Sequence, residues 1–102
     1  MADQTTDRRL DNWLFRARFF KKRSDAARII EKGKVRVTRD STTKRVTKCG
    51  YRLLIGDQVT FMRGTTLFQV EIMGFPYRRG PASEARENYR IVETQICDTD
   101  DG

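Results

Sequence analysis

The chain has 102 residues and a mass of 11.9 kDa, enough for one small domain with a single modest core. It contains no histidine, which excludes Ser-His-Asp and Cys-His catalytic groups and all imidazole metal ligands. Cys49 and Cys97 lie far apart without metal-site spacing, and no segment resembles a signal peptide or a membrane span. We therefore expect a cytoplasmic protein with free thiols and no disulfide, metal or cofactor.

Positive charge is concentrated in the first half of the chain. The net charge is +7, but residues 8–52 contain sixteen Lys or Arg against four acidic residues, a net charge of +12. The rest of the chain has five basic and ten acidic residues, a net charge of −5. A basic run alone is most often a solvated surface, whereas such segregation is typical of a protein that binds a polyanion.

Two helices are predicted at the start of the chain. Residues 1–8 are polar and aperiodic, and we expect a flexible N-terminal arm in which Asp7 caps the first helix. After a turn near residues 21–23, Ser24 is a preferred N-cap for a second helix, and Gly33 is placed to end it. The apolar positions at helical spacing are Leu10, Trp13, Leu14 and Ala17 in the first helix, and Ala26, Ile29 and Ile30 in the second. We expect Arg9, Asn12 and Arg16 on the opposite, polar side of the first helix.

The start of the second helix is the candidate binding site. A helix start offers unpaired N–H groups and the positive end of the macrodipole, which suit a phosphate. Lys21, Lys22 and Arg23 immediately precede this start, and Ser24, Arg28 and Lys32 follow at four-residue intervals on one face. Four further cations are expected to flank it: Arg9, Arg18, Lys34 and Arg36. Phe19 and Phe20 lie beside the basic turn, where each belongs either to the core or to a base-stacking surface.

The middle of the chain predicts a small, mostly antiparallel sheet. Val35 and Val37 alternate with Arg36, residues 38–44 form a polar loop, and residues 45–47 are the returning strand. Gly56 and Asp57 are typical of a turn before the strand at residues 58–62. After a second turn, residues 67–73 form another strand. We expect the two helices to bury their apolar faces against this α+β sheet.

The end of the chain differs in composition. Gly80 and Pro81 stand where a short helix would begin, and Ala82, Ala85 and Tyr89 follow at helical spacing. Arg78 and Arg79 precede it as two solvated arginines or a second basic contact. The predicted organisation is an arm at residues 1–8, an RNA-binding domain at 9–75, an extension with a short helix at 76–92, and a disordered acidic tail at 93–102.

The stretch RLDNWLFRARFFKKRSDAARIIEKGKVRV, residues 9–37, resembles the RNA-binding domain named after ribosomal protein S-four, the alpha-L motif. Within it, the segment from Trp13 to Lys21 and RRGPASEA at residues 78–85 resemble the heat-shock protein fifteen family. That family commonly turns after its first strand with Asn-Gly, whereas a longer loop is expected here.

The resemblance implies two helices on a small sheet with a basic face, and partners in ribosomal RNA and the large subunit, with tRNA as a further candidate. It implies RNA contact at Arg9, Asp11, Arg18, Lys21, Arg23, Ser24, Arg28, Lys32 and Lys34, with Asp11 orienting neighbouring arginines. We expect a monomer that does not bind membranes and has no catalytic residues.

Three alternatives remain open. A helix-turn-helix DNA-binding protein also has two short helices, but its second helix usually exposes Asn or Gln, which residues 24–32 lack. An accessory domain of an RNA-modifying enzyme would make Asp57 or Cys49 candidate reactive groups. Attachment to an anionic membrane would need an apolar helix face that the core already uses.

Overall fold

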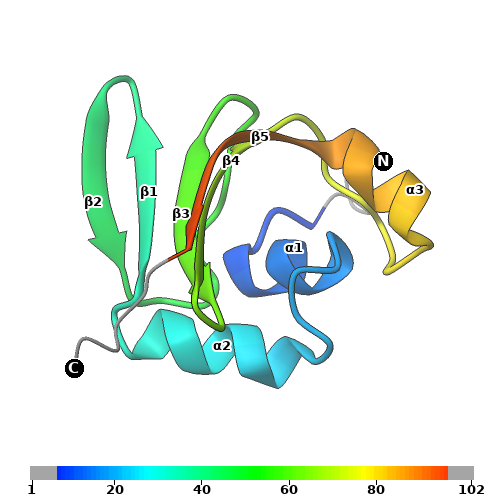
Figure 1. Ribbon diagram of the computed structural model, residues 1–102, viewed down its shortest axis with the longest axis horizontal. Helices are drawn as coiled ribbons and strands as arrows, with labels where there is room; N and C mark the ends of the chain where they lie inside the picture. Colours follow the sequence, from blue (N-terminus) through cyan, green and yellow to red (C-terminus); the bar gives the residue numbers. More distant parts are fainter. Residues whose placement is uncertain (1–6, 97–102) are drawn as a thin grey trace.

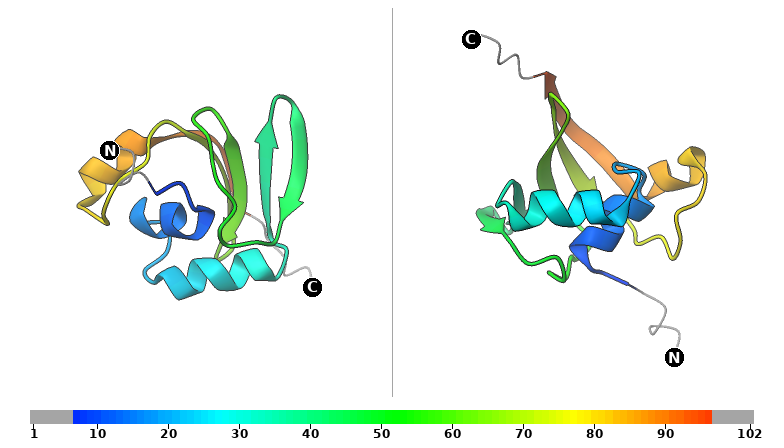
Figure 2. Two further views of the ribbon diagram at one scale, coloured as in Figure 1. Left: turned by 180° about the vertical axis from the view of Figure 1, so that it is seen from behind. Right: turned by 90° about the horizontal axis from the view of Figure 1, so that it is seen from below.

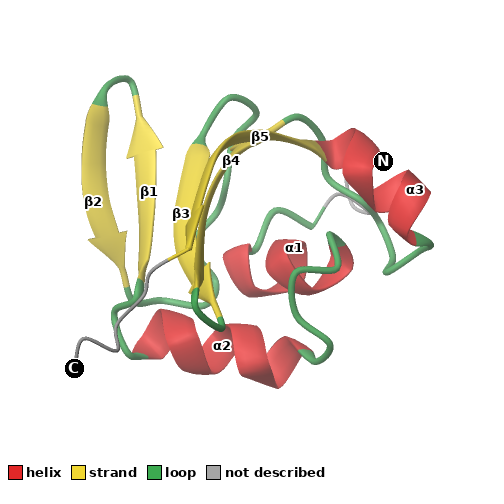
Figure 3. Cartoon of the chain, in the orientation of Figure 1, coloured by secondary structure: helices red, strands yellow, loops and turns green. Residues whose placement is uncertain are grey.

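The computed structural model describes residues 7–96 as one five-stranded antiparallel sheet with three helices, an α+β fold (Figure 1, Figure 3). The strand order is β2-β1-β3-β4-β5. Among the described residues, no helix combines the length and the apolar character that a bilayer crossing requires. The elements in chain order are α1 (Leu10–Arg16), α2 (Arg23–Glu31), β1 (Val35–Arg39), β2 (Thr42–Val46), β3 (Gln58–Arg63), β4 (Thr66–Ile72), α3 (Ala82–Ala85), the short helix η2 (Arg86–Asn88) and β5 (Tyr89–Ile96).

The sheet curves around α1, and α2 lies along one side of the same core (Figure 1, Figure 2). Alternation in the strands places Val37, Val59 and Val70 inward, and helical spacing turns Leu14 and Ile30 toward them. The predicted apolar faces of both helices and strands are therefore confirmed. Asn12 is a correction, because it was expected on the polar side of α1 and is buried.

Both helices end in the same hydrogen-bonded arrangement. After α2, Gly33 has a φ of 75°, and the N–H groups of Gly33 and Lys34 donate to the carbonyls of Ile30 and Ile29. After α1, Arg18 takes the equivalent position with a φ of 70°. A side chain in this left-handed region costs about 1–2 kcal/mol relative to glycine. The α1–α2 connection therefore contains an arginine where backbone geometry favours glycine.

The predicted helix caps are each wrong by two residues. The cap of α2 is Lys22, in extended conformation, so Ser24 lies inside the first turn and makes no capping hydrogen bond. The cap of α1 is Arg9, and the Asp7 carboxylate accepts the N–H of Arg9 itself at 3.0 Å. The connection after Arg18 is short, so α2 begins at Arg23. A cap at Ser24 would place the start of the helix two residues later.

The first hairpin is tighter than the sequence predicts. Val35 pairs with Val46 and Arg39 with Thr42, which leaves a two-residue turn of Asp40 and Ser41. Both residues have positive φ, 53° and 67°, the geometry that right-twisted hairpins require. The expected long loop at residues 38–44 and return strand at 45–47 are therefore corrected to a turn at 40–41 and β2 at 42–46.

A fifth strand replaces part of the expected helix and tail. Tyr89, predicted at helical spacing, begins β5, and its partner in β4 is Ile72. Residues 93–96, expected in a disordered acidic tail, complete this strand, while residues 97–102 lie outside the described part. The predicted short helix is present as α3 and η2 over residues 82–88. Segment 76–92 thus packs against the sheet and extends it.

A buried carboxylate joins the sheet to the loop before β3. Asp57 is 2% exposed and accepts two hydrogen bonds from the Arg39 guanidinium, at 2.8 and 2.7 Å, and one from the Leu54 N–H at 2.8 Å. The pKa of Arg39 is raised, chiefly by its hydrogen bond to Asp57. Within the described residues no buried side-chain polar atom lacks a partner.

Replacing Asp57 with Asn should lower the free energy of unfolding by about 2–3 kcal/mol, because an ionic fork becomes a neutral contact while Arg39 keeps some access to water. Urea denaturation followed by circular dichroism measures this change. The matched control is Glu71→Gln, which breaks the exposed pair with Arg90 and should cost less than about 1 kcal/mol. Equal losses in the two variants would contradict the role assigned to Asp57.

Candidate nucleic-acid interface

The solvent-facing side of α2 carries a row of polar and cationic side chains. Ser24, Arg28 and Lys32 are exposed, while Ala26 and Ile30 on the opposite side are fully buried. Lys21 and Lys22 are exposed at the start of the helix. The Asp25 N–H donates to the Lys22 carbonyl at 3.1 Å, so the N–H groups of Arg23 and Ser24 are the donors that this end of α2 presents beside its cations. Arg28 also contacts the Asp25 carboxylate at 3.2 Å.

A polar network links the starts of the two helices. The Arg9 guanidinium donates to both oxygens of Asp11, at 3.1 and 3.0 Å, and Asp11 is 3% exposed. The hydrogen bond and charge of Asp11 raise the pKa of Arg9. Arg23 at the start of α2 donates to the side-chain oxygen of the buried Asn12 at 3.3 Å. These contacts fix the positions of Arg9 at the start of α1 and of Arg23 at the start of α2.

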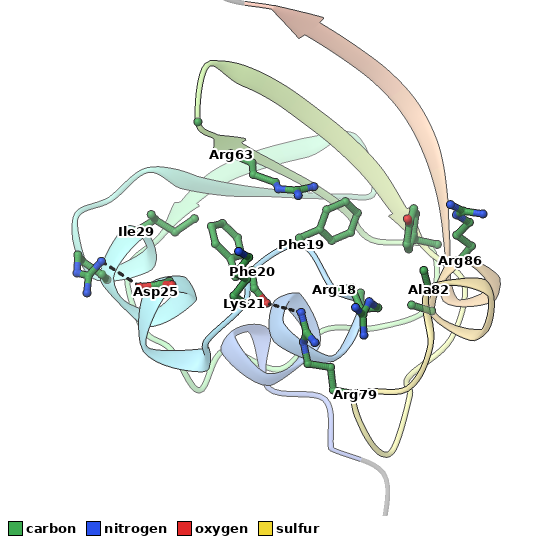
Figure 4. Close-up of a pocket in the computed structure, with 15 residues that line it drawn as sticks. Arg18, Phe19, Phe20, Lys21, Asp25, Ile29, Arg63, Arg79, Ala82 and Arg86 are labelled. Atoms are coloured by element: carbon green, nitrogen blue, oxygen red, sulfur yellow. Dashed lines mark hydrogen bonds and ion pairs between the residues drawn. The ribbon is translucent and has the colours of Figure 1, made fainter.

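Three of the predicted residues, Arg18, Lys21 and Arg28, line an open groove of about 860 Å³ beside α2 (Figure 4). The groove lies between the α1–α2 connection, the turn after β3, and the α3 helix. Three other cations line it: Arg63 and Arg86, which no sequence pattern marked, and Arg79, expected as a solvated arginine or a second basic contact. Aromatic rings of Phe19, Phe20 and Tyr89 complete its lining.

The last two predicted cations lie elsewhere. Lys34 and Arg36 line a smaller hollow of about 310 Å³ with Thr60, Met62 and Leu67. Arg36 is exposed between the buried Val35 and Val37, so it points away from the core side of the sheet. Of the eleven predicted residues, six lie on α2 or directly beside its ends: Lys21, Lys22, Arg23, Ser24, Arg28 and Lys32. Arg9 and Asp11 lie at the start of α1, Arg18 lies in the connection, and Lys34 and Arg36 lie past the C-terminal end of α2.

The two candidate reactive groups do not have the geometry of nucleophiles or bases. Asp57 is already bonded to Arg39 and Leu54. Burial is the first cause of a raised pKa at Cys49, followed by the negative charges of Asp11 and Glu31. A nucleophilic cysteine needs the opposite shift, toward the thiolate. Among the described residues, no group of acidic or cysteine side chains is arranged to hold a metal ion.

Because the Cys49 pKa is raised, the thiolate should form at higher pH in the folded than in the unfolded chain. We expect iodoacetamide alkylation of Cys49 to increase with pH along a curve displaced upward relative to the same protein in urea. Mass spectrometry of the Cys97→Ser variant isolates this thiol. If Cys49 of the folded protein were alkylated at the same pH as in the unfolded protein, or at a lower pH, the raised pKa would be contradicted.

Similarity to known proteins defines the class to which this fold belongs. Residues 8–37 match the S4 domain family, and this match covers α1, the connection and α2. The chain is 32% identical over 88 residues to the heat shock protein 15 homolog of Haemophilus influenzae, covering 86% of this chain and 63% of that relative. It therefore spans less than two thirds of that relative's length.

A solved structure gives the same result. The trimeric structure of heat shock protein 15 from Vibrio cholerae is similar with a TM-score of 0.71 and 34% identity, over 82% of this chain and 80% of that chain. The chain belongs to the heat shock protein 15 family and has its S4-type fold. The resemblance identified from residues 9–37 and 78–85 is therefore confirmed.

Proposed function

We propose that this protein binds structured RNA, and that its target is ribosomal RNA of the large subunit. The observation that carries the proposal is the exposed row on α2, with Arg28 and Lys32 one helical turn apart and Lys21 and Lys22 at the helix start. Phosphates along an RNA backbone would meet these cations and the first amides of α2, those of Arg23 and Ser24, together.

The neighbouring network supports the same surface. Arg9 and Arg23 are held by Asp11 and Asn12, so these two cations lose little rotamer freedom when a phosphate binds. Structured RNA is recognised mainly by shape, phosphate and 2′-hydroxyl contacts, because its deep major groove is too narrow for side chains. Binding should therefore have little sequence specificity.

The rival functions fit these residues less well. A DNA-reading helix usually exposes Asn or Gln beside Arg to base edges, whereas the exposed row of α2 contains Arg28 but no Asn or Gln. The raised pKa of Cys49 and the hydrogen bonds that already occupy Asp57 favour a binding protein over a catalyst. We propose that the protein acts without catalysis, cofactor or membrane, in the cytoplasm where ribosomes are found.

The Arg28→Gln/Lys32→Gln variant should bind a folded large-subunit rRNA fragment more weakly and with less salt dependence. Each lost phosphate contact reduces the slope of log K against log salt by about one, so the slope should fall by about two. Fluorescence anisotropy at several salt concentrations measures both quantities.

The matched control is Arg78→Gln/Arg90→Gln, which removes the same charge from residues paired with Glu84 and Glu71. Its salt slope should equal that of the wild type. Equal effects in the two variants would show that net charge, not the α2 surface, governs binding. Duplex DNA that competes as well as rRNA would favour the DNA-binding alternative.

The number of chains per particle is a separate question. The sequence predicts a monomer, whereas the Vibrio cholerae relative forms a trimer. Light scattering on the free protein and on its rRNA complex should give the mass of one chain per particle, and a mass of three chains would overturn the monomer. Adding tRNA to the complex in the same measurement tests the further candidate partner.

A further inference from the structure

We propose that the groove beside α2 binds an unpaired nucleotide of the RNA, with its base against Phe20 and its phosphates on Lys21, Arg63 and Arg86. This inference rests on the proposed RNA-binding function and adds a second, chemically different contact to it. The α2 row contacts the phosphate backbone of an RNA duplex, while the groove would bind a base that is no longer stacked in that duplex.

The groove has the size and lining that a nucleotide requires. Its volume of about 860 Å³ falls within the range of small-ligand sites, roughly 300–1,000 Å³. Phe20 and Tyr89 are half-buried and line it, and Figure 4 shows Phe20 projecting from the α1–α2 connection toward the side where Arg63 reaches in. The Phe20 ring rests on Phe61, with centroids 5.9 Å apart, which supports it from beneath.

The charge of the groove suits a phosphate backbone. Six cations line it against one acid, Asp25, which is paired with Arg28. Within residues 7–96, Lys21, Arg63 and Arg86 form no ion pair and no side-chain hydrogen bond. These three come from the α1–α2 connection, the end of β3 and the helix η2, so they surround the opening from separate elements. Such unpaired cations around an aromatic surface are typical of single-stranded nucleic-acid sites.

The two other arginines hold the groove in shape. Arg79 donates to the carbonyls of Phe15 and Phe20 at 3.1 and 3.3 Å, and its guanidinium lies over the Phe15 ring. Arg18 donates to the carbonyl of Gly80 at 2.9 Å. These contacts tie the connection carrying Phe20 to the segment before α3. The aromatic surface is therefore rigid before RNA binds, which reduces the entropic cost of binding.

The aromatic ring in the groove favours an unpaired nucleotide over a paired one. In an RNA duplex the faces of each base are covered by stacked neighbours, so only a bulged or looped base can lie on an aromatic ring. The backbone on either side of such a base would continue from the groove toward Arg28 and the α2 row. One RNA with a bulge in its stem can thus engage both surfaces.

The test compares two RNA hairpins with the same stem, one fully paired and one carrying an unpaired adenosine bulge. The wild-type chain should bind the bulged hairpin about tenfold more tightly, the low end of what base stacking contributes. Phe20→Leu should remove this preference and leave affinity for the paired hairpin unchanged, since leucine keeps the contact with Phe61 but lacks a flat ring. Fluorescence anisotropy measures both affinities.

Phe75→Leu is the matched control, because Phe75 is also half-buried but lies outside the groove, under Arg8. It should keep the preference. Arg63→Gln changes an exposed residue at the end of β3 and should reduce affinity for the bulged hairpin more than for the paired one, so the test does not depend on a core residue.

The outcomes separate the two proposals. Equal wild-type affinity for both hairpins would overturn the groove assignment and leave the α2 surface intact, whereas binding to neither would overturn the proposed function. A preference that survives Phe20→Leu would also overturn the assignment. If free adenosine monophosphate removes the preference when added at the concentration of the hairpin, the groove would instead be a site for free nucleotides.

Discussion

The burial of one ring, Phe19, determines where the second helix begins. Phe19 lies within 6.0 Å of the ring centroids of Trp13, Phe61, Phe68 and Tyr89, so it joins α1, the middle of the sheet and the last strand. To place this ring the chain must reverse at Arg18, which accounts for the left-handed φ there. The same reversal leaves Phe20 and Lys21 at the surface beside α2.

The N-terminal half of the fold was predictable because its signals are local. The spacing of Leu10, Trp13 and Leu14 identified α1, and Gly33 marked the end of α2. The first hairpin was predicted, but its turn was made too long for an equally local reason, since Asp40 and Ser41 adopt the conformation normally associated with Asn-Gly. No neighbouring residue signals that these two side chains accept positive φ.

The strand β5 was not predictable from its own residues. All but the first of its eight residues are exposed, so it lacks the apolar alternation that identifies a half-buried strand. Its pairing with β4 is also interrupted between Gln69 and Val70. Its position depends on the edge that β4 offers and on Tyr89, which packs against Phe19 from seventy positions away in the chain. The spacing of Ala82 and Ala85 described a real helix but gave no indication that it stops before Tyr89.

The candidate site likewise has one part that the sequence predicted, the α2 row, and one part that it did not, the groove. The residues of the α2 row were found by spacing, because all of them lie on one helix. The groove was not, because Arg63 and Arg86 are separated from Lys21 by most of the sheet in sequence and carry no motif. Arg79 was expected as a solvated arginine or a second basic contact, yet it is bonded to the carbonyls of Phe15 and Phe20.

The pairing of β5 with β4 has a consequence for partly folded forms of the chain. If β5 and the segment before α3 detached together, the contacts within the helix pair, its polar network and the α2 row would remain, whereas the connection would lose its bonds to Gly80 and Arg79. Tyr89, Arg79 and Arg86 would leave, and the opening beside Phe20 would lose one wall. Such a partial opening would leave the α2 row as a binding surface and remove the groove, while the rest of the domain stays folded. Hydrogen exchange along β5 would therefore report on the selectivity of the protein for its RNA.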